Sequence, residues 1–196
     1  MYGISCSGSN DVWLVDIGNA GPALRYLQKD QGIKGVFLTH AHYDHIQGIN
    51  ALAEAFPNCM FYCAEHTRDA LYSDKLNLSF YHEQPVVYEG ENVIILKDHE
   101  LVPLNGSLKV KVIATPGHNP GCLSFKLGNF LFTGDSFIPG IPVVTKLKGG
   151  NKAENIASLA ILFQEIDEET IICPGHGEIV QLTMREIDAL KQSLDA

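Results

Sequence analysis

Residues 39–45, Thr-His-Ala-His-Tyr-Asp-His, constrain the fold of this chain more than any other stretch. They place three imidazoles and one carboxylate within six positions, directly after the apolar run Val36–Leu38. Burying such groups without partners is costly, so a buried strand that ends in them needs hydrogen-bond partners or a bound ion. The candidate metal ligands of this stretch are His40, His42, Asp44 and His45.

Three more polar residues follow apolar strands, and each has a glycine beside it. They are His118 after Ile113, Asp135 after Phe132, and His176 after Ile172. Glycine at such places lets the backbone turn tightly and approach a cofactor closely. Because ligand sites in layered α/β folds collect at the carboxyl ends of strands, we expect these residues to converge with the first motif.

The predicted ligand set is His40, His42, Asp44, His45, His118, Asp135 and His176. Imidazole and carboxylate without thiolate suit zinc, and they also suit iron or manganese. A single zinc site takes only three or four protein groups, so this set fits two metal ions about 3.5–4 Å apart better than one. We therefore expect two zinc ions per chain, with iron or manganese as alternatives.

Length and composition narrow the class of protein. The 196 residues fit one domain over 1–196, and a net charge of −9 argues against nucleic-acid binding. The sequence lacks an apolar run of about eighteen residues that would span a membrane, and its start lacks the features of a signal peptide. We expect the protein in the cytoplasm, with its five cysteines mostly buried and reduced.

The hydrophobic pattern predicts strands that alternate with helices in the first half of the chain. The expected strands there are 3–6, 12–17, 34–38 and 59–64, and the expected helices are 22–31 and 46–56. In the second half we expect strands over 93–96, 101–104, 108–114, 122–127, 130–132 and 170–173, and helices over 153–166 and 183–194. Asn105-Gly106 and Gly128-Asn129 predict hairpin turns. Together these elements predict an α/β fold, an αββα sandwich of two mixed sheets between outer helices.

Two loops are candidates for contact with a substrate. Residues 66–90 carry aromatic side chains without clear periodicity, so we expect a short helix and then a long loop. This loop, which contains His82, either lies over a site as a lid or simply packs its aromatic rings. The second loop, 137–150, carries Lys146 and Lys148, which either attract an anionic substrate or belong to a solvated flap.

Five motifs in order along the chain resemble the metallo-β-lactamase fold superfamily, and most closely its glyoxalase II-type hydrolase branch. They are V-D-I-G at 15–18, T-H-A-H-Y-D-H at 39–45, T-P-G-H-N-P-G at 115–121, F-T-G-D-S at 132–136 and P-G-H-G at 174–177. The resemblance covers nearly the whole chain. It implies one metal on His40, His42 and His118, a second on Asp44, His45 and His176, and Asp135 as the bridge between them.

The resemblance also implies a reaction. A hydroxide shared by two metals is the nucleophile, and Asp44 and Asp135 are the catalytic carboxylates that orient it and take up its proton. Thr39 and Thr115 are candidates for supporting the ligands. Asp16 either joins them or caps the turn after its own strand.

The leading hypothesis is a zinc-dependent hydrolase of a small ester or thioester, acting on a small-molecule substrate without nucleic-acid or membrane partners. Homodimers are common among such enzymes, so a homodimer is one expected assembly. The alternatives are a persulfide dioxygenase-like enzyme with one iron, a phosphodiesterase, and a metal-binding protein without turnover. Only the residues up to 196 follow His176, so we do not expect the glutathione-binding helical domain of glyoxalase II. Asp135 stands where zinc β-lactamases carry cysteine, which argues against a β-lactamase.

Overall fold

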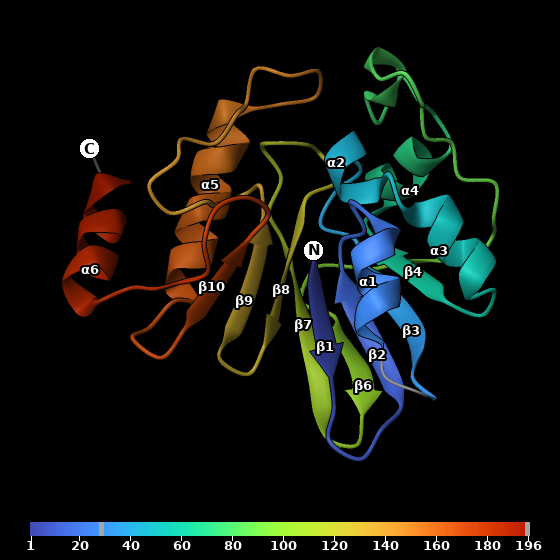
Figure 1. Ribbon diagram of the computed structural model, residues 1–196. Helices are drawn as coiled ribbons and strands as arrows, with labels where there is room; N and C mark the ends of the chain where they lie inside the picture. The colour runs from blue at the N-terminus through green and yellow to red at the C-terminus, as the bar shows by residue number, and fades with distance from the viewer. Residues whose placement is uncertain (28–29, 195–196) are drawn as a thin grey trace. The chain divides into compact units, whose positions relative to one another are not determined.

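The computed structural model describes residues 1–27 and 30–194. Within the chain, contacts group into two compact units, Met1–Leu96 and Lys97–Ala196, which we call the N-terminal and the C-terminal unit. Each unit is built on one β-sheet and its own helices (Figure 1). The prediction of a single domain over 1–196 stays a prediction.

The sheet of the N-terminal unit has five strands in the order β1-β2-β3-β4-β5. Strand β1 pairs antiparallel with β2, whereas β2, β3, β4 and β5 are parallel to one another. The strands are β1 Tyr2–Ser5, β2 Asp11–Val15, β3 Gly32–Phe37, β4 Met60–Cys63 and β5 Val93–Ile95. The helices are α1 Ala20–Tyr26, α2 Tyr43–Ile46, α3 Ile49–Ala55 and α4 Glu65–Leu71, followed by the 3₁₀ turn η1 Ser79–Tyr81.

The two faces of this sheet differ because side chains alternate along a strand. One face packs Leu14 and Val36 with Leu52 of α3 in a continuous apolar core. On the other face, the rings of Trp13 and Phe37 stack with centroids 5.5 Å apart, and both residues are buried. In β2 the residues from Val12 to Val15 are therefore all apolar and buried, as in a strand covered on both faces.

The sheet of the C-terminal unit has six strands in the order β11-β10-β9-β8-β7-β6. Strands β9 and β10 are parallel, and every other neighbouring pair is antiparallel. The strands are β6 Leu101–Asn105, β7 Leu108–Ala114, β8 Leu123–Leu127, β9 Phe130–Gly134, β10 Ile171–Pro174 and β11 Val180–Gln181. The helices are α5 Lys152–Gln164 and α6 Met184–Ser193.

Helices α5 and α6, orange and red in Figure 1, pack on the sheet of their own unit. Leu162 of α5 and Ile187 of α6 share one core with Leu131 of β9. A capping box between Thr183 and Glu186 starts α6. Just after α5, Lys126 Nζ donates to the backbone oxygen of Glu165 at 2.6 Å, so this end of the helix is tied to β8.

The structure confirms the predicted fold class, α/β with two mixed sheets and flanking helices, and it confirms both hairpin turns. The helix predicted over 46–56 is split into α2 and α3, because Gly48 donates its N–H to Ile17 O at 2.9 Å. The helix predicted over 22–31 ends at Tyr26, and part of its predicted length, 28–29, lies outside the described residues. The short edge strand β11 was not predicted.

Within residues 1–27 and 30–194, none of the helices combines the length and the hydrophobicity that crossing a membrane requires. The longest, α5, has 13 residues. No disulfide joins the cysteines of the described chain; four of the five are buried and Cys6 is half-buried.

Candidate metal centre

The first motif lies where two parallel strands end side by side. Val15 at the end of β2 pairs with Phe37 at the end of β3, so the residues that follow, Asp16 and Thr39, meet at one edge of the sheet. There Asp16 adopts a positive φ of 59°. Few residues other than glycine adopt such a φ, although aspartate does so more readily than most. This backbone turn directs the Asp16 carboxylate toward the motif at 39–45.

Asp16 holds that motif with both carboxylate oxygens. Its Oδ1 accepts the backbone N–H of Thr39 at 2.7 Å, and its Oδ2 accepts the Thr39 hydroxyl at 2.8 Å. His45 Nδ1 lies 2.8 Å from the same Oδ2. Asp16 is only 4% exposed, so these are buried, charge-assisted contacts of the stronger kind. Of the two interpretations of Asp16, the contacts favour support of the motif.

These contacts decide which nitrogen of each imidazole can bind a metal. A carboxylate can only accept, so His45 Nδ1 carries the proton in its bond to Asp16. The Thr39 hydroxyl gives its one proton to Asp16 and therefore accepts from His40 Nδ1, 3.1 Å away. In both rings the lone pair is thus on Nε2. Fixing the tautomer through Nδ1 is the usual way in which proteins orient metal-binding histidines.

The V-D-I-G motif packs against the same segment. Ile17 N donates to His45 O at 2.8 Å. Gly18 passes so close to Asp44 that a Cβ on it would lie 2.3 Å from the Asp44 carbonyl oxygen. Glycine is required at position 18 for this approach, and the motif at 15–18 is therefore part of the support for 39–45.

The four predicted ligands of the N-terminal unit form one cluster. The ring of His40 lies with its centroid 4.6 Å from that of His42 and 4.1 Å from that of His45. All three histidines are buried. Asp44 differs, because its side chain is half exposed while its Oδ2 lies 3.7 Å from His45 Nε2. The carboxylate is therefore the member of this cluster that solvent reaches most easily.

The three predicted ligands of the C-terminal unit meet at one edge of its sheet. The parallel strands β9 and β10 end together, with Gly134 paired to Pro174, so Asp135 and His176 are neighbours. Asp135 Oδ2 lies 3.6 Å from His118 Nε2 and 3.4 Å from His176 Nε2. Asp135 is the central residue of this group, with a histidine on each side.

His118 is oriented in the same way as His40 and His45. Its Nδ1 lies 2.7 Å from the backbone oxygen of Val144, and a carbonyl can only accept, so the lone pair of this ring is also on Nε2. Before it, Gly117 adopts a φ of +134°, and a Cβ there would lie 2.4 Å from Asn155 Cα. Position 117 therefore requires glycine to lead the chain from β7 to His118.

A hydroxyl cluster joins the strand ends that carry His118 and Asp135. Ser136 Oγ lies 3.0 Å from the backbone oxygen of Thr115 and 2.9 Å from its hydroxyl, and Ser124 Oγ lies 3.0 Å from the Thr115 hydroxyl. Thr115 thus supports the ligand-bearing loops as predicted, although it acts through Ser136. Neither Ser136 nor the Val144 carbonyl was predicted from the sequence. Serine in the F-T-G-D-S motif was a usable signal for the first, whereas a backbone oxygen leaves none.

The spacing of donor atoms within each unit fits a bound metal ion. Donors about 2.1 Å from a tetrahedral zinc ion lie about 3.4 Å from one another. The three Nε2-to-carboxylate distances, 3.7, 3.6 and 3.4 Å, are close to this value. Each is longer than an ordinary hydrogen bond. Residues of both units therefore fit the metal chemistry that their types suggest.

The remaining candidate residues fall into different environments. His82 stacks on Tyr43, with centroids 3.7 Å apart. His99 is exposed beside Asp98, and His66 is half-buried. Lys146 and Lys148 are exposed on the loop after Asp135.

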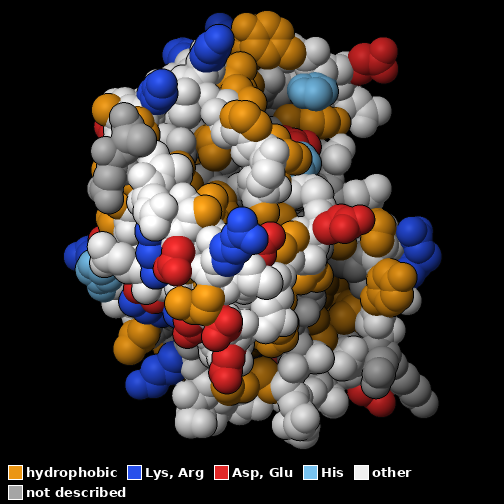
Figure 2. All heavy atoms as spheres, turned by 90° about the vertical axis from the view of Figure 1, so that its left-hand side faces the viewer, with side chains coloured by type: hydrophobic (Ala, Val, Ile, Leu, Met, Phe, Trp, Pro, Cys, Tyr) orange, Lys and Arg blue, Asp and Glu red, His pale blue; other side chains and the backbone are white. Residues whose placement is uncertain are grey.

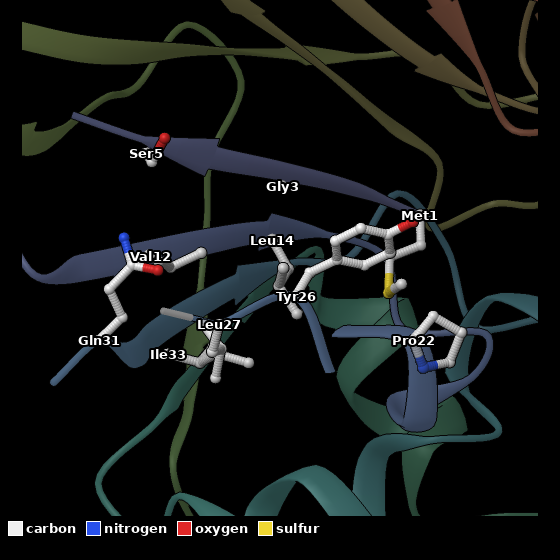
Figure 3. Close-up of a pocket in the computed structure, with 10 residues that line it drawn as sticks. All are labelled: Met1, Gly3, Ser5, Val12, Leu14, Pro22, Tyr26, Leu27, Gln31 and Ile33. Carbon is white, nitrogen blue, oxygen red and sulfur yellow. The ribbon is translucent and has the colours of Figure 1, made fainter. Parts of the chain in front are cut away.

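A cavity of about 380 Å³ in the N-terminal unit is unrelated to these residues. It lies beside β1 and β2, next to α1, and its wall includes Leu14, Tyr26 and Ile33 (Figure 3). None of the predicted ligands lines it.

Fold and site together define an α/β protein whose candidate metal ligands follow strand ends. The family model of the metallo-beta-lactamase superfamily matches residues 6–176, so the match contains the first four motifs and ends at His176 within the fifth. The chain belongs to the metallo-β-lactamase superfamily.

Three relatives describe its place in that superfamily. Over 167 residues the chain is 32% identical to the hydroxyacylglutathione hydrolase of Enterobacter sp. (strain 638), which covers 83% of this chain and 56% of that protein. The chain thus spans about half the length of this curated relative. Among solved structures it is similar to the BLEG-1 B3 metallo-beta-lactamase, with a TM-score of 0.82, 25% identity and coverage of 99% of this chain and 90% of the other. TTHA1623 in a di-iron-bound form has a TM-score of 0.77 at 23% identity, over 96% and 90% of the two chains.

Proposed function

We propose that this protein is a metal-dependent hydrolase that cleaves a small ester or thioester at a dinuclear centre. In this proposal, which follows the family resemblance, His40, His42 and His118 would hold one ion, Asp44, His45 and His176 would hold the other, and Asp135 would serve both. The observation that carries the proposal is the shared orientation of His40, His45 and His118, whose Nδ1 atoms all bond to oxygen acceptors of the protein.

Metal ions bound there would polarise the scissile carbonyl and lower the pKa of a water molecule toward neutrality. The protein's part is to position this water and to receive its proton. Asp44 suits that role because its carboxylate is half exposed beside His45. Asp135, between two histidines, suits the orienting role. A separate serine or cysteine nucleophile is not needed.

Zinc is the first candidate for the metal, because imidazole and carboxylate ligands suit it. Iron is the second, because the similar protein TTHA1623 was solved in a di-iron-bound form. A thioester is the first candidate for the substrate, since the hydroxyacylglutathione hydrolase of Enterobacter is similar over most of this chain. The likeness to BLEG-1 adds a β-lactam to the substrates worth testing.

We also propose that the protein acts in the cytoplasm on a small molecule, without a nucleic-acid partner. The net charge of −9 supports the last point. On the face drawn in Figure 2, acidic side chains lie among the basic ones.

The test combines metal content with a substrate panel. Protein purified without added metal is analysed for zinc, iron and manganese, and then assayed with a thioester, an ester, a phosphodiester and a β-lactam. Two zinc ions per chain with thioester or ester hydrolysis is the expected result. One iron per chain with oxygen-dependent sulfur oxidation would instead support the dioxygenase alternative. Failure to bind metal after reconstitution would refute the predicted site.

The Asp135→Ala variant tests the bridging role directly. We expect it to lose one or both ions and to lose activity in parallel, because both metals share this carboxylate in the proposal. The control is Asp167→Asn, which changes a carboxylate that accepts local hydrogen bonds from Glu169 and Thr170. Unchanged metal stoichiometry in Asp135→Ala would refute the bridging assignment.

A further inference from the structure

In the loop at 72–90, the ring of His82 contacts the motif at 39–45. His82 stacks on Tyr43 almost in parallel, with a centroid distance of 3.7 Å and an interplanar angle of 13°. Tyr43 stands between His42 and Asp44 in the motif and is half-buried, whereas His82 is exposed. The loop is therefore placed directly beside two of the predicted ligands.

Buried polar groups hold this loop in one conformation. The Asn77 side-chain amide donates to the backbone oxygens of Ala70 and Val86 at 3.0 and 2.9 Å. Ser79 Oγ accepts from Val86 N at 2.8 Å. Asn77 and Ser79 are both fully buried, so each bond that they make would be costly to break. These buried hydrogen bonds fix the backbone on both sides of residues 79–82.

Residues 79–82, held by these hydrogen bonds, expose two large aromatic rings to solvent. Phe80 is 42% exposed and Tyr81 76% exposed, and their centroids lie 3.8 Å apart. Rings that take part only in the core are buried, as Tyr88 of the same loop is. Clustered exposed aromatic side chains on a rigid support are typical of surfaces that bind a ligand.

The charges of this loop restrict the kind of ligand. Asp74, Glu83 and Glu89 oppose the single cation Lys75 between positions 72 and 90. The protein as a whole carries 23 acidic against 14 basic residues. Like charges repel, so a polyanionic group is disfavoured beside this loop, whereas an uncharged ring is not.

We propose that Tyr43, Phe80, Tyr81 and His82 form an aromatic wall that selects substrates with an uncharged aromatic or apolar group. The inference rests on the proposed hydrolase function and adds to it a substrate class. In this arrangement the ester or thioester carbonyl faces the ligands of the motif, while the apolar group packs on the wall. The wall residues determine specificity and take no part in the chemical step.

Binding of non-hydrolysable analogues tests the wall without depending on turnover. The probes are three thioethers of N-acetylcysteamine that carry a 2-phenylethyl, an ethyl or a 2-carboxyethyl group. Their dissociation constants are measured by calorimetry on the zinc-loaded protein. We expect the phenylethyl probe to bind most tightly and the carboxyethyl probe most weakly. Replacing His82 or Tyr81 by alanine should weaken phenylethyl binding about 2- to 12-fold, the range for one aromatic contact, and leave ethyl binding unchanged.

Matched controls are available for both variants. His99→Ala removes another exposed histidine, and Tyr26→Ala removes another exposed tyrosine, neither of which belongs to the wall. These controls should keep the preference for the phenylethyl probe. Equal binding of the phenylethyl and ethyl probes to the wild type would overturn the proposal. Tightest binding of the carboxyethyl probe, lost on replacing Lys146 and Lys148, would overturn it in favour of anion selection.

The same series separates this inference from the proposed function. Hydrolysis of the phenylacetyl thioester of N-acetylcysteamine is followed in parallel. A phenylethyl preference that depends on His82 and Tyr81, without any hydrolysis, would support the wall and count against the hydrolase. Hydrolysis without that preference would leave the hydrolase standing and refute the wall.

Discussion

Replacing Asp16 by asparagine tests whether this residue sets the metal-binding state of the first motif. Asparagine has nearly the same shape, but one carboxylate oxygen becomes an NH₂ group. If that group faces Thr39 N, two donors meet where the wild type has a 2.7 Å hydrogen bond. If it faces His45 instead, Nδ1 must accept, and the ring proton moves to Nε2. Either orientation disturbs the motif.

The size of the effect follows from the contacts that change. Loss of a hydrogen bond to a buried charged group costs about 1.5–3 kcal/mol, so we expect the metal-free variant to be about 2 kcal/mol less stable. Partners that orient metal-binding histidines contribute about 10- to 100-fold in metal affinity. We therefore expect zinc affinity to fall by about that factor. Urea unfolding of the metal-free protein measures the first quantity, and competition with a chromophoric chelator measures the second.

Asp167→Asn is the matched control. Asp167 also accepts the Thr170 hydroxyl and the backbone N–H of Glu169, and these bonds hold the pKa of its carboxyl below the ordinary value. Neither of these two hydrogen bonds involves a predicted metal ligand, so the Asp167→Asn variant should keep the wild-type zinc affinity. If Asp16→Asn binds zinc within twofold of the wild type while remaining folded, the tautomer argument is wrong.

Three further predictions concern stability and reactivity. Burial raises the pKa of Glu165, but its bonds and charge interactions with two lysines outweigh this, so the net pKa is lowered. The contribution of Glu165 to the free energy of unfolding is therefore present above the unfolded-state pKa and is lost as pH falls through the folded-state pKa. Glu165→Gln should lower the free energy of unfolding by about 1 kcal/mol at pH 7. In urea unfolding, the variant should also lose less stability than the wild type as the pH falls. Burial raises the pKa of Cys59 and of Cys63 to about 12, so at pH 8 a thiol reagent should modify Cys6 well before either, as peptide mass spectrometry would show. Asn77→Ala should lower the unfolding free energy by about 2–3 kcal/mol, because it removes three buried hydrogen bonds and leaves the Ser79 N–H without its Asn77 partner; a thermal melt within a degree of the wild type would contradict the bracing role.

The sequence by itself determined most of the helices and strands and the chemical types of the residues in the candidate site. Val36–Leu38 followed by the motif at 39–45 is a local pattern, since a buried strand is continuously apolar and its end is marked by polar groups. The turns at Asn105-Gly106 and Gly128-Asn129 are local as well, because glycine and asparagine tolerate the backbone angles that a tight hairpin needs. Because these patterns are local in the sequence, the candidate ligands could be named before the structure was known.

Tertiary structure decided how those residues act. The proton positions on His40 and His45 depend on Asp16, more than twenty residues earlier in the chain, and that of His118 depends on a backbone oxygen at Val144. The stacking of His82 on Tyr43 likewise joins segments that no periodicity relates. Hydrophobic periodicity reports which face of an element is buried, whereas a hydrogen bond or a ring contact requires the distance and angle between two elements. Those quantities exist only once the chain has folded.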